Sequence, residues 1–323
     1  MEADNVSYKT LIYSRENLVQ VFTGTYTKVD KDVAIKILYF DQIEKANVVF
    51  KEILSMQRFR DLEGVAKLYD QAISQKEDGK FFIRIVMELY TKGDLNKLIN
   101  ARKNTKRFFT EAELIDHLKS IVKNFAHFQT LNLAHRDIKP ENIFIGDDNK
   151  LIIGDLGCFN DSSQQSSTIA GTPNYLSPEL KKAYVAHLSG ESVILSHDVY
   201  KSDVFSLGLT FLYMACLDEG PINVPFNSYQ YEQYIGKKFN KIQTRYPEFV
   251  KILILMLYFD PSQRYDFKQL ASHLSIEIKS GPVQLKCSSC DKILTGQIWS
   301  YNDVKICNQC IDRFEANKTP PKL

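Results

Sequence analysis

Short apolar segments typical of β-strands dominate the first part of the chain. β-Branched residues recur at every second position of one segment: Val19, Val21, Thr23 and Thr25. Residues 33–38 and residues 81–89 form two further apolar runs, which predict strands. Between them, residues 41–58 place apolar side chains three to six positions apart, which indicates a helix. We therefore expect a β-rich first part with one helix.

The middle of the chain carries the pattern of longer helices. Thr110 followed by Glu113 is the signature of a capping box at the start of a helix. Apolar residues then recur at helical spacing: Leu114, Ile115, Leu118, Ile121, Val122 and Phe125. Residues 142–153 return to short strands, residues 159–170 are polar without periodicity, and residues 203–276 are again helical. The polar segment is predicted to be a mobile loop.

Composition limits the class of protein. The 323 residues are enough for two packed cores, or for one large domain with an appendix. Residues are 44% hydrophobic and 25% charged, as in ordinary globular proteins, and the net charge of +2 favours neither nucleic acid nor an acidic membrane as a partner. No apolar stretch approaches the roughly 20 residues that span a bilayer, and the N-terminus has no secretory pattern. We expect an intracellular protein, cytoplasmic or nuclear, without membrane contact.

Four of the six cysteines form two Cys-x-x-Cys pairs near the C-terminus, and in a reducing compartment such pairs favour metal over disulfide. Cys287 and Cys290 are separated by 16 residues from Cys307 and Cys310, a spacing that fits tetrahedral zinc. With four thiolates, the Zn²⁺ site is expected to be structural. The alternative is two incidental cysteine pairs.

The segment around these cysteines is predicted to be a separate module. It follows the breaker Ser280-Gly281-Pro282, and residues 298–301 and 304–306 can form a hairpin between the two pairs. We expect a zinc-ribbon-like module over residues 283–315 and a disordered tail over residues 316–323. The mixed charge of the module favours a protein partner over nucleic acid.

Residues with chemical roles gather in the middle of the chain. The run His135-Arg136-Asp137-Ile138-Lys139-Pro140-Glu141-Asn142 places four groups suited to phosphate, metal or proton chemistry close together, which a plain polar turn does not explain. Asp155-Leu156-Gly157 follows an apolar strand, and Gly171-Thr172-Pro173 and Ser177-Pro178-Glu179 come later. Upstream, residues 33–36 (Val-Ala-Ile-Lys) end an apolar strand on a lysine, which is a weak signal alone.

These motifs, in this order, resemble the signature set of the eukaryotic protein kinase family, in its serine/threonine branch. The resemblance covers roughly residues 10–276. It implies an α+β, bilobal fold over residues 1–280, with a β-rich N-lobe over about residues 1–88 and a mainly α-helical C-lobe over about residues 91–280. It also implies transfer of the γ-phosphate of Mg-ATP to serine or threonine hydroxyls of protein substrates.

The resemblance assigns a nucleotide site to residues on both lobes. Lys36 is expected to hold the α- and β-phosphates, with Glu52 as its partner. Asn142 and Asp155 are expected to bind Mg²⁺ or Mn²⁺. The remaining expected ATP contacts are the base and ribose positions: Val21, Ala34, Met87, Glu88, Tyr90, Asp94 and Phe144. Asp94 equally suits a role in the fold.

The resemblance also assigns the catalytic and regulatory positions. Asp137 orients the substrate hydroxyl and accepts its proton, Lys139 neutralises the transferred group, and Thr172 positions Asp137. Arg136 suggests control by phosphorylation of the activation loop at Thr168, for which neighbouring serines could substitute. Glu179 and Arg264 are expected to form a buried ion pair, and Asp203 to anchor His135.

Two departures from the family pattern leave alternatives open. Ser14, Glu16 and Val19 stand where the family has the three glycines of its phosphate-covering loop, so we expect a raised Michaelis constant for ATP. A pseudokinase scaffold that only binds partners is the alternative function. The stretch around residues 186–198 is longer than the family pattern, and it is either a docking surface or a tolerated insertion.

Overall fold

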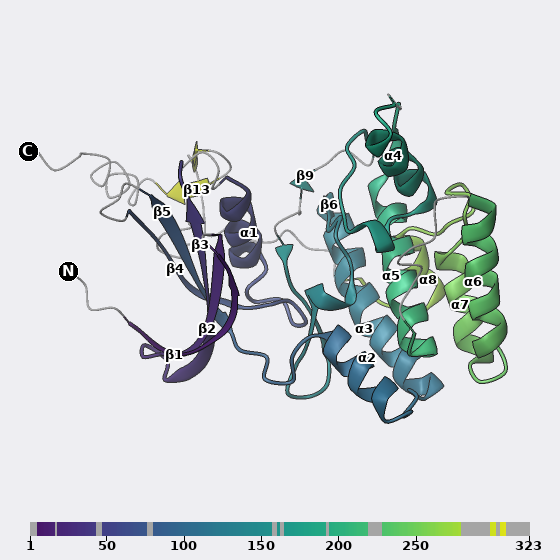
Figure 1. Ribbon diagram of the computed structural model, residues 1–323, viewed down its shortest axis with the longest axis horizontal. Helices are drawn as coiled ribbons and strands as arrows, with labels where there is room; N and C mark the ends of the chain where they lie inside the picture. The colour runs from purple at the N-terminus through teal and green to yellow at the C-terminus, as the bar shows by residue number, and fades with distance from the viewer. Residues whose placement is uncertain are drawn as a thin grey trace, which may run out of the picture. The chain divides into compact units, whose positions relative to one another are not determined.

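The computed structural model describes residues 5–16, 18–42, 47–75, 80–156, 160–161, 165–191, 194–218, 228–278, 298–301 and 304–307 (Figure 1). These residues fall into two compact units. One contains the chain up to Leu89 together with the C-terminal hairpin, and the other runs from Tyr90 to Ser280. The division falls between the predicted N-lobe, which ends at about residue 88, and the predicted C-lobe, which begins at about residue 91. No helix of the described residues has the length and apolar character that crossing a membrane requires.

The first unit is built on one antiparallel five-stranded sheet of order β1-β2-β3-β5-β4. Its elements are β1 (Val6–Arg15), β2 (Val19–Tyr26), β3 (Lys31–Phe40), α1 (Asn47–Arg58), β4 (Leu68–Gln75) and β5 (Phe81–Glu88). Strand β3 alternates, so that Val33, Ile35 and Ile37 are buried in the core of the unit. The intervening residues of β3 therefore face the other side of the sheet.

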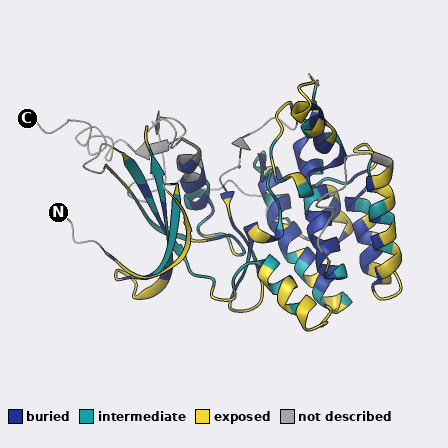
Figure 2. Cartoon of the chain, in the orientation of Figure 1, coloured by how far each residue is buried: buried dark blue, intermediate teal, exposed yellow. Residues whose placement is uncertain are grey.

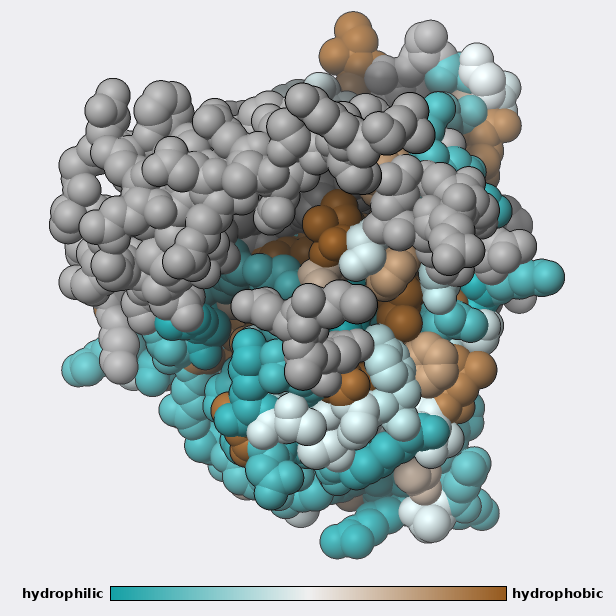
Figure 3. All heavy atoms as spheres, turned by 90° about the vertical axis from the view of Figure 1, so that its left-hand side faces the viewer, coloured by the Kyte–Doolittle hydropathy of each residue, from teal (hydrophilic) through white to brown (hydrophobic). Residues whose placement is uncertain are grey.

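Strand β1 is the edge strand of this sheet and pairs only with β2. All its residues except Val6 are exposed, including four large apolar or aromatic side chains: Tyr8, Leu11, Ile12 and Tyr13. Hydrophobic and hydrophilic residues both occur on the described part of the surface that is turned to the viewer in Figure 3. A scattered pattern of this kind is ordinary for a protein surface.

The second unit is mainly helical, with two- and three-residue strands between its helices. Its helices are α2 (Leu95–Asn104), α3 (Glu111–Thr130), α4 (Pro178–Leu188), α5 (Val199–Cys216), α6 (Ser228–Ile242), α7 (Pro247–Met256) and α8 (Phe267–His273). Its strands and 3₁₀ turns are β6 (Leu133–Ala134), η2 (Pro140–Asn142), β7 (Ile143–Ile145), β8 (Leu151–Ile153), β9 (Asn160–Asp161), β10 (Gln165–Ser166), η4 (Pro173–Tyr175) and β11 (His197–Asp198).

Helix α5 forms the centre of the helical unit. It is buried almost along its whole length, and α3, α6, α7 and α8 pack against it (Figure 2). Apolar residues on all sides of one helix are typical of such a central position. The predicted capping box of α3 is confirmed, since Thr110 accepts from the amide of Glu113 and Glu113 accepts from the amide of Thr110. This cap fixes the start of α3.

The predicted hairpin near the C-terminus is confirmed in the backbone. Strands β12 (Ile298–Tyr301) and β13 (Val304–Cys307) pair antiparallel. Cys287, Cys290 and Cys310, the ends of the predicted module and the predicted disordered tail lie outside the described residues, and for Cys307 only the strand is described. The structure therefore leaves the zinc ribbon a prediction.

The prediction of a mobile loop over residues 159–170 is wrong in two places. Asn160–Asp161 pairs with β6, and Gln165–Ser166 pairs with β11. Both pairings are two residues long and join segments that are distant in sequence. The polar pattern of the loop therefore could not predict them. The predicted insertion ends in β11, so its last residues are part of this pairing.

Candidate active site

The sheet of the first unit gathers four predicted nucleotide contacts on one face. Val21 pairs with Lys36 across β2 and β3, and Ala34 pairs with Met87 across β3 and β5. Because Ala34 and Lys36 are two positions apart on β3, their side chains share a face, and directly paired residues share it too. Glu88, at the end of β5, pairs with Val33, so its side chain lies on the opposite face of the sheet from Ala34 and Lys36. Its amide donates to the carbonyl of Lys67.

Lys36 and Glu52 form an ion pair between β3 and α1. The Lys36 Nζ lies 2.9 and 3.1 Å from the two carboxylate oxygens of Glu52. The side chain of Glu52 is 8% exposed and that of Lys36 is 24% exposed. A half-buried lysine held by a carboxylate has a fixed direction, so its ammonium group is preorganised to bind an anion such as a phosphate.

Asp137 lies at the centre of a network in the helical unit. Its Oδ1 accepts from the hydroxyl of Thr172 at 2.7 Å, and its Oδ2 accepts from Lys139 Nζ at 2.8 Å and from the amide of Asn142 at 3.1 Å. Lys139 Nζ also donates to Thr172 at 2.7 Å. Burial acts to raise the pKa of Asp137, but the hydrogen bonds from Lys139 and Thr172 outweigh it and hold the pKa below its usual value. Asp137 is therefore a carboxylate at neutral pH.

The backbone of this loop is held in place by Asp203 of α5, as predicted. The Asp203 carboxylate accepts from the amides of His135 and Arg136, at 2.7 and 2.9 Å. Arg136 has a φ of 66°, a conformation that ordinary residues rarely adopt and that persists only when its surroundings enforce it. The two hydrogen bonds from these amides to Asp203 supply that restraint.

The buried imidazole of His135 bridges two segments of the site. Its Nδ1 lies 3.3 Å from the amide of Asp137, and its Nε2 lies 3.0 Å from the carbonyl of Gly154. Because the amide can only donate, Nδ1 is the acceptor and Nε2 carries the proton. Burial lowers the pKa of His135, so the ring is neutral. The segment before Asp155 is thereby tied to the Asp137 loop.

Asn142 and Asp155 carry the oxygen atoms suited to a divalent cation. The Asn142 side-chain nitrogen donates to the carbonyl and carboxylate of Asp137, so its oxygen is the atom available to a metal. Asp155 is exposed and has a φ of 50°. The described residues contain no group of three or more His, Cys, Asp and Glu placed to hold a metal. Mg²⁺ is usually bound by one or two protein oxygens, with phosphates and waters completing its shell, so these two residues fit it.

Phe144 forms an aromatic platform with Tyr90. The two rings stack with centroids 5.3 Å apart and an angle of 13° between their planes. A side chain at position 154 would overlap the ring of Phe144, so Gly154 is required by this packing. Asp94 caps α2 by accepting from the amide of Lys97 at 2.8 Å, so its carboxylate serves the fold.

The three positions of the glycine-less loop lie at the β1–β2 connection. Ser14 is in β1, Glu16 is in the turn and Val19 begins β2, and both Ser14 and Glu16 are exposed. The effect of these side chains on ATP affinity stays a prediction.

Arg136 contacts Thr168, the predicted regulatory residue. The Arg136 Nη2 lies 2.5 Å from the Thr168 hydroxyl and 3.1 Å from its carbonyl oxygen. The side chain of Thr168 is exposed. Gly171 fixes the segment that follows, because its φ is 114° and an added Cβ would lie 2.9 Å from the carbonyl of Arg136.

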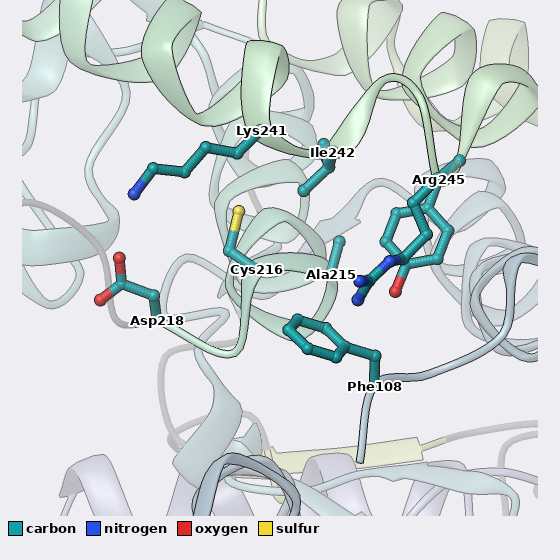
Figure 4. A pocket seen from close by; sticks show the side chains of 8 residues that line it. Phe108, Ala215, Cys216, Asp218, Lys241, Ile242 and Arg245 are labelled. Carbon is teal, nitrogen blue, oxygen red and sulfur yellow. The ribbon is translucent and has the colours of Figure 1, made fainter. Parts of the chain in front are cut away.

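A separate cavity of about 160 Å³ lies in the helical unit (Figure 4). Its lining comes from α5, α6 and the segments beside α3 and α7: Phe108, Ala215, Cys216, Asp218, Lys241, Ile242, Arg245 and Tyr246. None of the predicted site residues lines it. Burial raises the pKa of the Cys216 thiol to about 11, so this cysteine is protonated and a poor nucleophile at neutral pH.

Two residues of the site region, His197 and Ser202, were not found from the sequence. His197, Ser202 and Ser177 form a buried polar chain next to the Thr168 segment. Lone histidines and serines carry no spacing signal. The only cue was that His197 lies in the unusually long stretch before Asp203.

Comparisons with known proteins agree with this geometry. Residues 17–275 match the protein kinase domain. The chain is 27% identical over 273 residues to the probable serine/threonine-protein kinase nek2 of Dictyostelium discoideum, covering 79% of this chain and 60% of that protein. It is 28% identical to the serine/threonine-protein kinase atg1 of the same organism, covering 63% of this chain and 29% of that one.

A viral protein matches this chain over nearly its whole length. The chain is 26% identical to the serine/threonine-protein kinase R436 of Acanthamoeba polyphaga mimivirus, covering 84% of this chain and 94% of that one. The cellular relatives named above are longer, and the chain spans 60% or less of their length. Because the domain match covers most of its length, the chain belongs to the protein kinase family.

Proposed function

We propose that this chain is an active serine/threonine protein kinase. The observation that carries the proposal is the Asp137 network, in which one carboxylate is held by Lys139, Asn142 and Thr172 within 3.1 Å. The paired Lys36 and Glu52 support it, because this ion pair must be in place for phosphoryl transfer in the family. The names of the relatives support serine and threonine as acceptors.

Each residue of the site has a defined task in this proposal. Bound Mg-ATP supplies the γ-phosphoryl group with its charge partly neutralised. Asp137 orients the substrate hydroxyl and takes its proton as the new oxygen–phosphorus bond forms and the bond to ADP breaks. Lys139 offsets the negative charge that develops on the transferred group, and Asn142 and Asp155 hold the cation. Lys36 binds the α- and β-phosphates.

Transfer to a peptide library tests the proposal. We expect label from the γ-position of Mg-ATP to appear on serine and threonine peptides and not on matched peptides with tyrosine as the only acceptor. No transfer, even from protein with a phosphorylated activation loop, would favour the scaffold function that the missing loop glycines suggest. We also propose that the protein is cytoplasmic, with the nucleus as the alternative compartment.

We also propose that phosphorylation of Thr168 raises activity. Arg136 adjoins Asp137 in sequence, and its guanidinium already contacts the Thr168 hydroxyl. A phosphate on this hydroxyl would place about 1.5–2 negative charges beside the positively charged guanidinium. Thr168→Ala is expected to lower kcat at least tenfold relative to phosphorylated protein, a loss of about 1.4 kcal/mol or more in barrier terms. The measurement is steady-state transfer by protein whose phosphorylation is determined by mass spectrometry. Full activity in Thr168→Ala protein free of phosphate would refute this control.

We propose further that the C-terminal cysteines bind one structural Zn²⁺. The β12–β13 hairpin follows the first pair in sequence and ends on Cys307 of the second pair, an arrangement in which each pair can form one knuckle of a ribbon. Metal analysis of purified protein is expected to give one zinc per chain, and Cys287→Ser to abolish it. Cys216→Ser is the matched control and should keep the metal. A protein partner of this module is a further expectation, because a closed thiolate site has no catalytic use.

A further inference from the structure

The Thr168 segment is attached to the start of α5 by a short strand pair. Strand β10 pairs with β11, and Ser166 lies opposite His197. Strand β11 leads directly into α5, whose first turn is capped by Asp198 through the amides of Tyr200 and Lys201. His197 therefore lies on the strand that leads into the buried helix α5, and it is paired with a segment that carries an exposed threonine.

One ring nitrogen of His197 is hydrogen-bonded and the other is not. The side chain is buried, with 5% of the residue exposed, and Nδ1 lies 2.8 Å from the hydroxyl of Ser202. That hydroxyl donates to Glu179 at 3.2 Å, so it can only accept from His197, and Nδ1 carries the proton. The buried Nε2 has no hydrogen-bond partner among the described residues.

A buried ring nitrogen without a partner is costly, and its neighbourhood suggests what would satisfy it. The carbonyl of Thr168 is close enough to act on the ring, and Arg136 Nη2 contacts both this carbonyl and the Thr168 hydroxyl. Thr168 therefore has both Arg136 and the ring of His197 as neighbours. A phosphate on that hydroxyl would place anionic oxygen atoms near Nε2.

We propose that His197 is the second cationic ligand of a phosphate on Thr168, opposite Arg136. This inference rests on the proposal that Thr168 is the phosphorylated residue. The unphosphorylated protein keeps His197 neutral, and the phosphate draws a proton onto Nε2, which then donates to a phosphoryl oxygen. A doubly held phosphate ties the activation segment to α5, and through Asp203 of the same helix it is linked to the loop that carries Asp137.

The charges around His197 are consistent with this switch. Burial lowers the pKa of His197 and is the dominant influence, while Glu179 from α4 and the Thr168 carbonyl raise it and Arg136 lowers it. Glu179 is itself neutralised by Arg264. The balance keeps the ring neutral until a further negative charge arrives, and a phosphate supplies that charge.

The test uses protein with phosphothreonine incorporated at position 168 and its unmodified counterpart, both with ¹³C-labelled histidine. The His197 resonance is assigned by its loss in His197→Asn, because asparagine retains a donor in the place of Nδ1 and removes Nε2. Phosphorylation is expected to raise the pKa of His197 by at least one unit, a tenfold change in proton affinity. An unchanged His197 pKa would overturn the inference.

Activity gives an independent readout of the same contact. The gain in kcat/KM on phosphorylation should be about tenfold smaller in His197→Asn than in wild type, the range expected for one charge-assisted hydrogen bond. His187→Asn, at an exposed histidine of α4, is the matched control and should keep the full gain. Equal gains in wild type and His197→Asn would contradict the proposal. Phosphorylation that raises the His197 pKa without raising activity would support the contact and reject control by Thr168.

Discussion

Asp137→Asn is expected to reduce phosphoryl transfer by about 10²- to 10⁴-fold, the range for removal of a general base. The amide occupies the same volume and can still accept hydrogen bonds from Lys139 or Thr172, so the loop should keep its shape. What it cannot do is take a proton from the substrate hydroxyl. The measurement is the initial rate of transfer from Mg-ATP to a serine peptide, with thermal unfolding as the check on folding.

Asp155→Asn is expected to lose activity by a different route. Its carboxylate is exposed and makes no hydrogen bond to the described residues, so the change removes the charge of the proposed Mg²⁺ ligand and little else. The loss should be partly reversed by raising the concentration of Mg²⁺, whereas the loss in Asp137→Asn should not respond. This difference separates the cation site from the proton acceptor.

The control for both variants is Asp116→Asn, at an exposed aspartate of α3. It makes the same chemical change away from the site and should leave the rate within twofold of wild type. Retention of more than a tenth of the wild-type rate by Asp137→Asn would show that Asp137 does not act as the base. A similar loss in Asp116→Asn would point to a general effect on folding.

The sequence predicted the elements whose signals are local. The capping box of α3 was found because Thr110 and Glu113 are three residues apart on a chain with helical periodicity behind them. The β12–β13 hairpin was found because two apolar runs flank a short turn. Strand β4 was not predicted, since polar and apolar residues alternate weakly in it and its pairing with β5 decides its conformation.

In the candidate site, too, some contacts were predicted from the sequence and others were not. The Glu179–Arg264 pair and the anchor at Asp203 were predicted from the family resemblance. The environment of His197 was not predictable, because the pairing of β10 with β11 brings together residues that are about thirty positions apart. For Asp94 the sequence allowed two roles, a ribose contact or a role in the fold. The structure shows that its side chain caps helix α2.

The second large expected effect is on stability, at the buried ion pair of the helical unit. The Arg264 side chain is 0% exposed, and its guanidinium lies 2.8 and 3.1 Å from the two oxygens of Glu179. It also donates to the carbonyls of three residues: Tyr258, Lys201 and Phe259. Arg264→Ala removes the cationic partner of the largely buried Glu179 carboxylate and one donor from each of three carbonyls, so we expect a loss of about 3–5 kcal/mol in the free energy of unfolding.

The pH dependence distinguishes loss of the charge pair from loss of packing. Burial acts to raise the pKa of Glu179, but Arg264 outweighs it and holds the pKa below its usual value. In wild type the pair therefore stabilises the fold above the pKa of an unfolded glutamate, and this contribution is lost as the pH falls. In Arg264→Ala the unpaired Glu179 should instead have a raised pKa and take up a proton early. The difference between the two proteins should therefore shrink from pH 7 toward pH 4.

Denaturant unfolding followed by the helical circular dichroism signal measures this difference, because the helices lie mainly in the unit that contains Arg264. Arg107→Ala, at an exposed arginine, is the matched control and should change stability by no more than about 0.5 kcal/mol. A loss below 1 kcal/mol in Arg264→Ala would contradict the assigned role. A loss that stays constant with pH would mean that packing of the arginine side chain, and not its charge, stabilises this part of the fold.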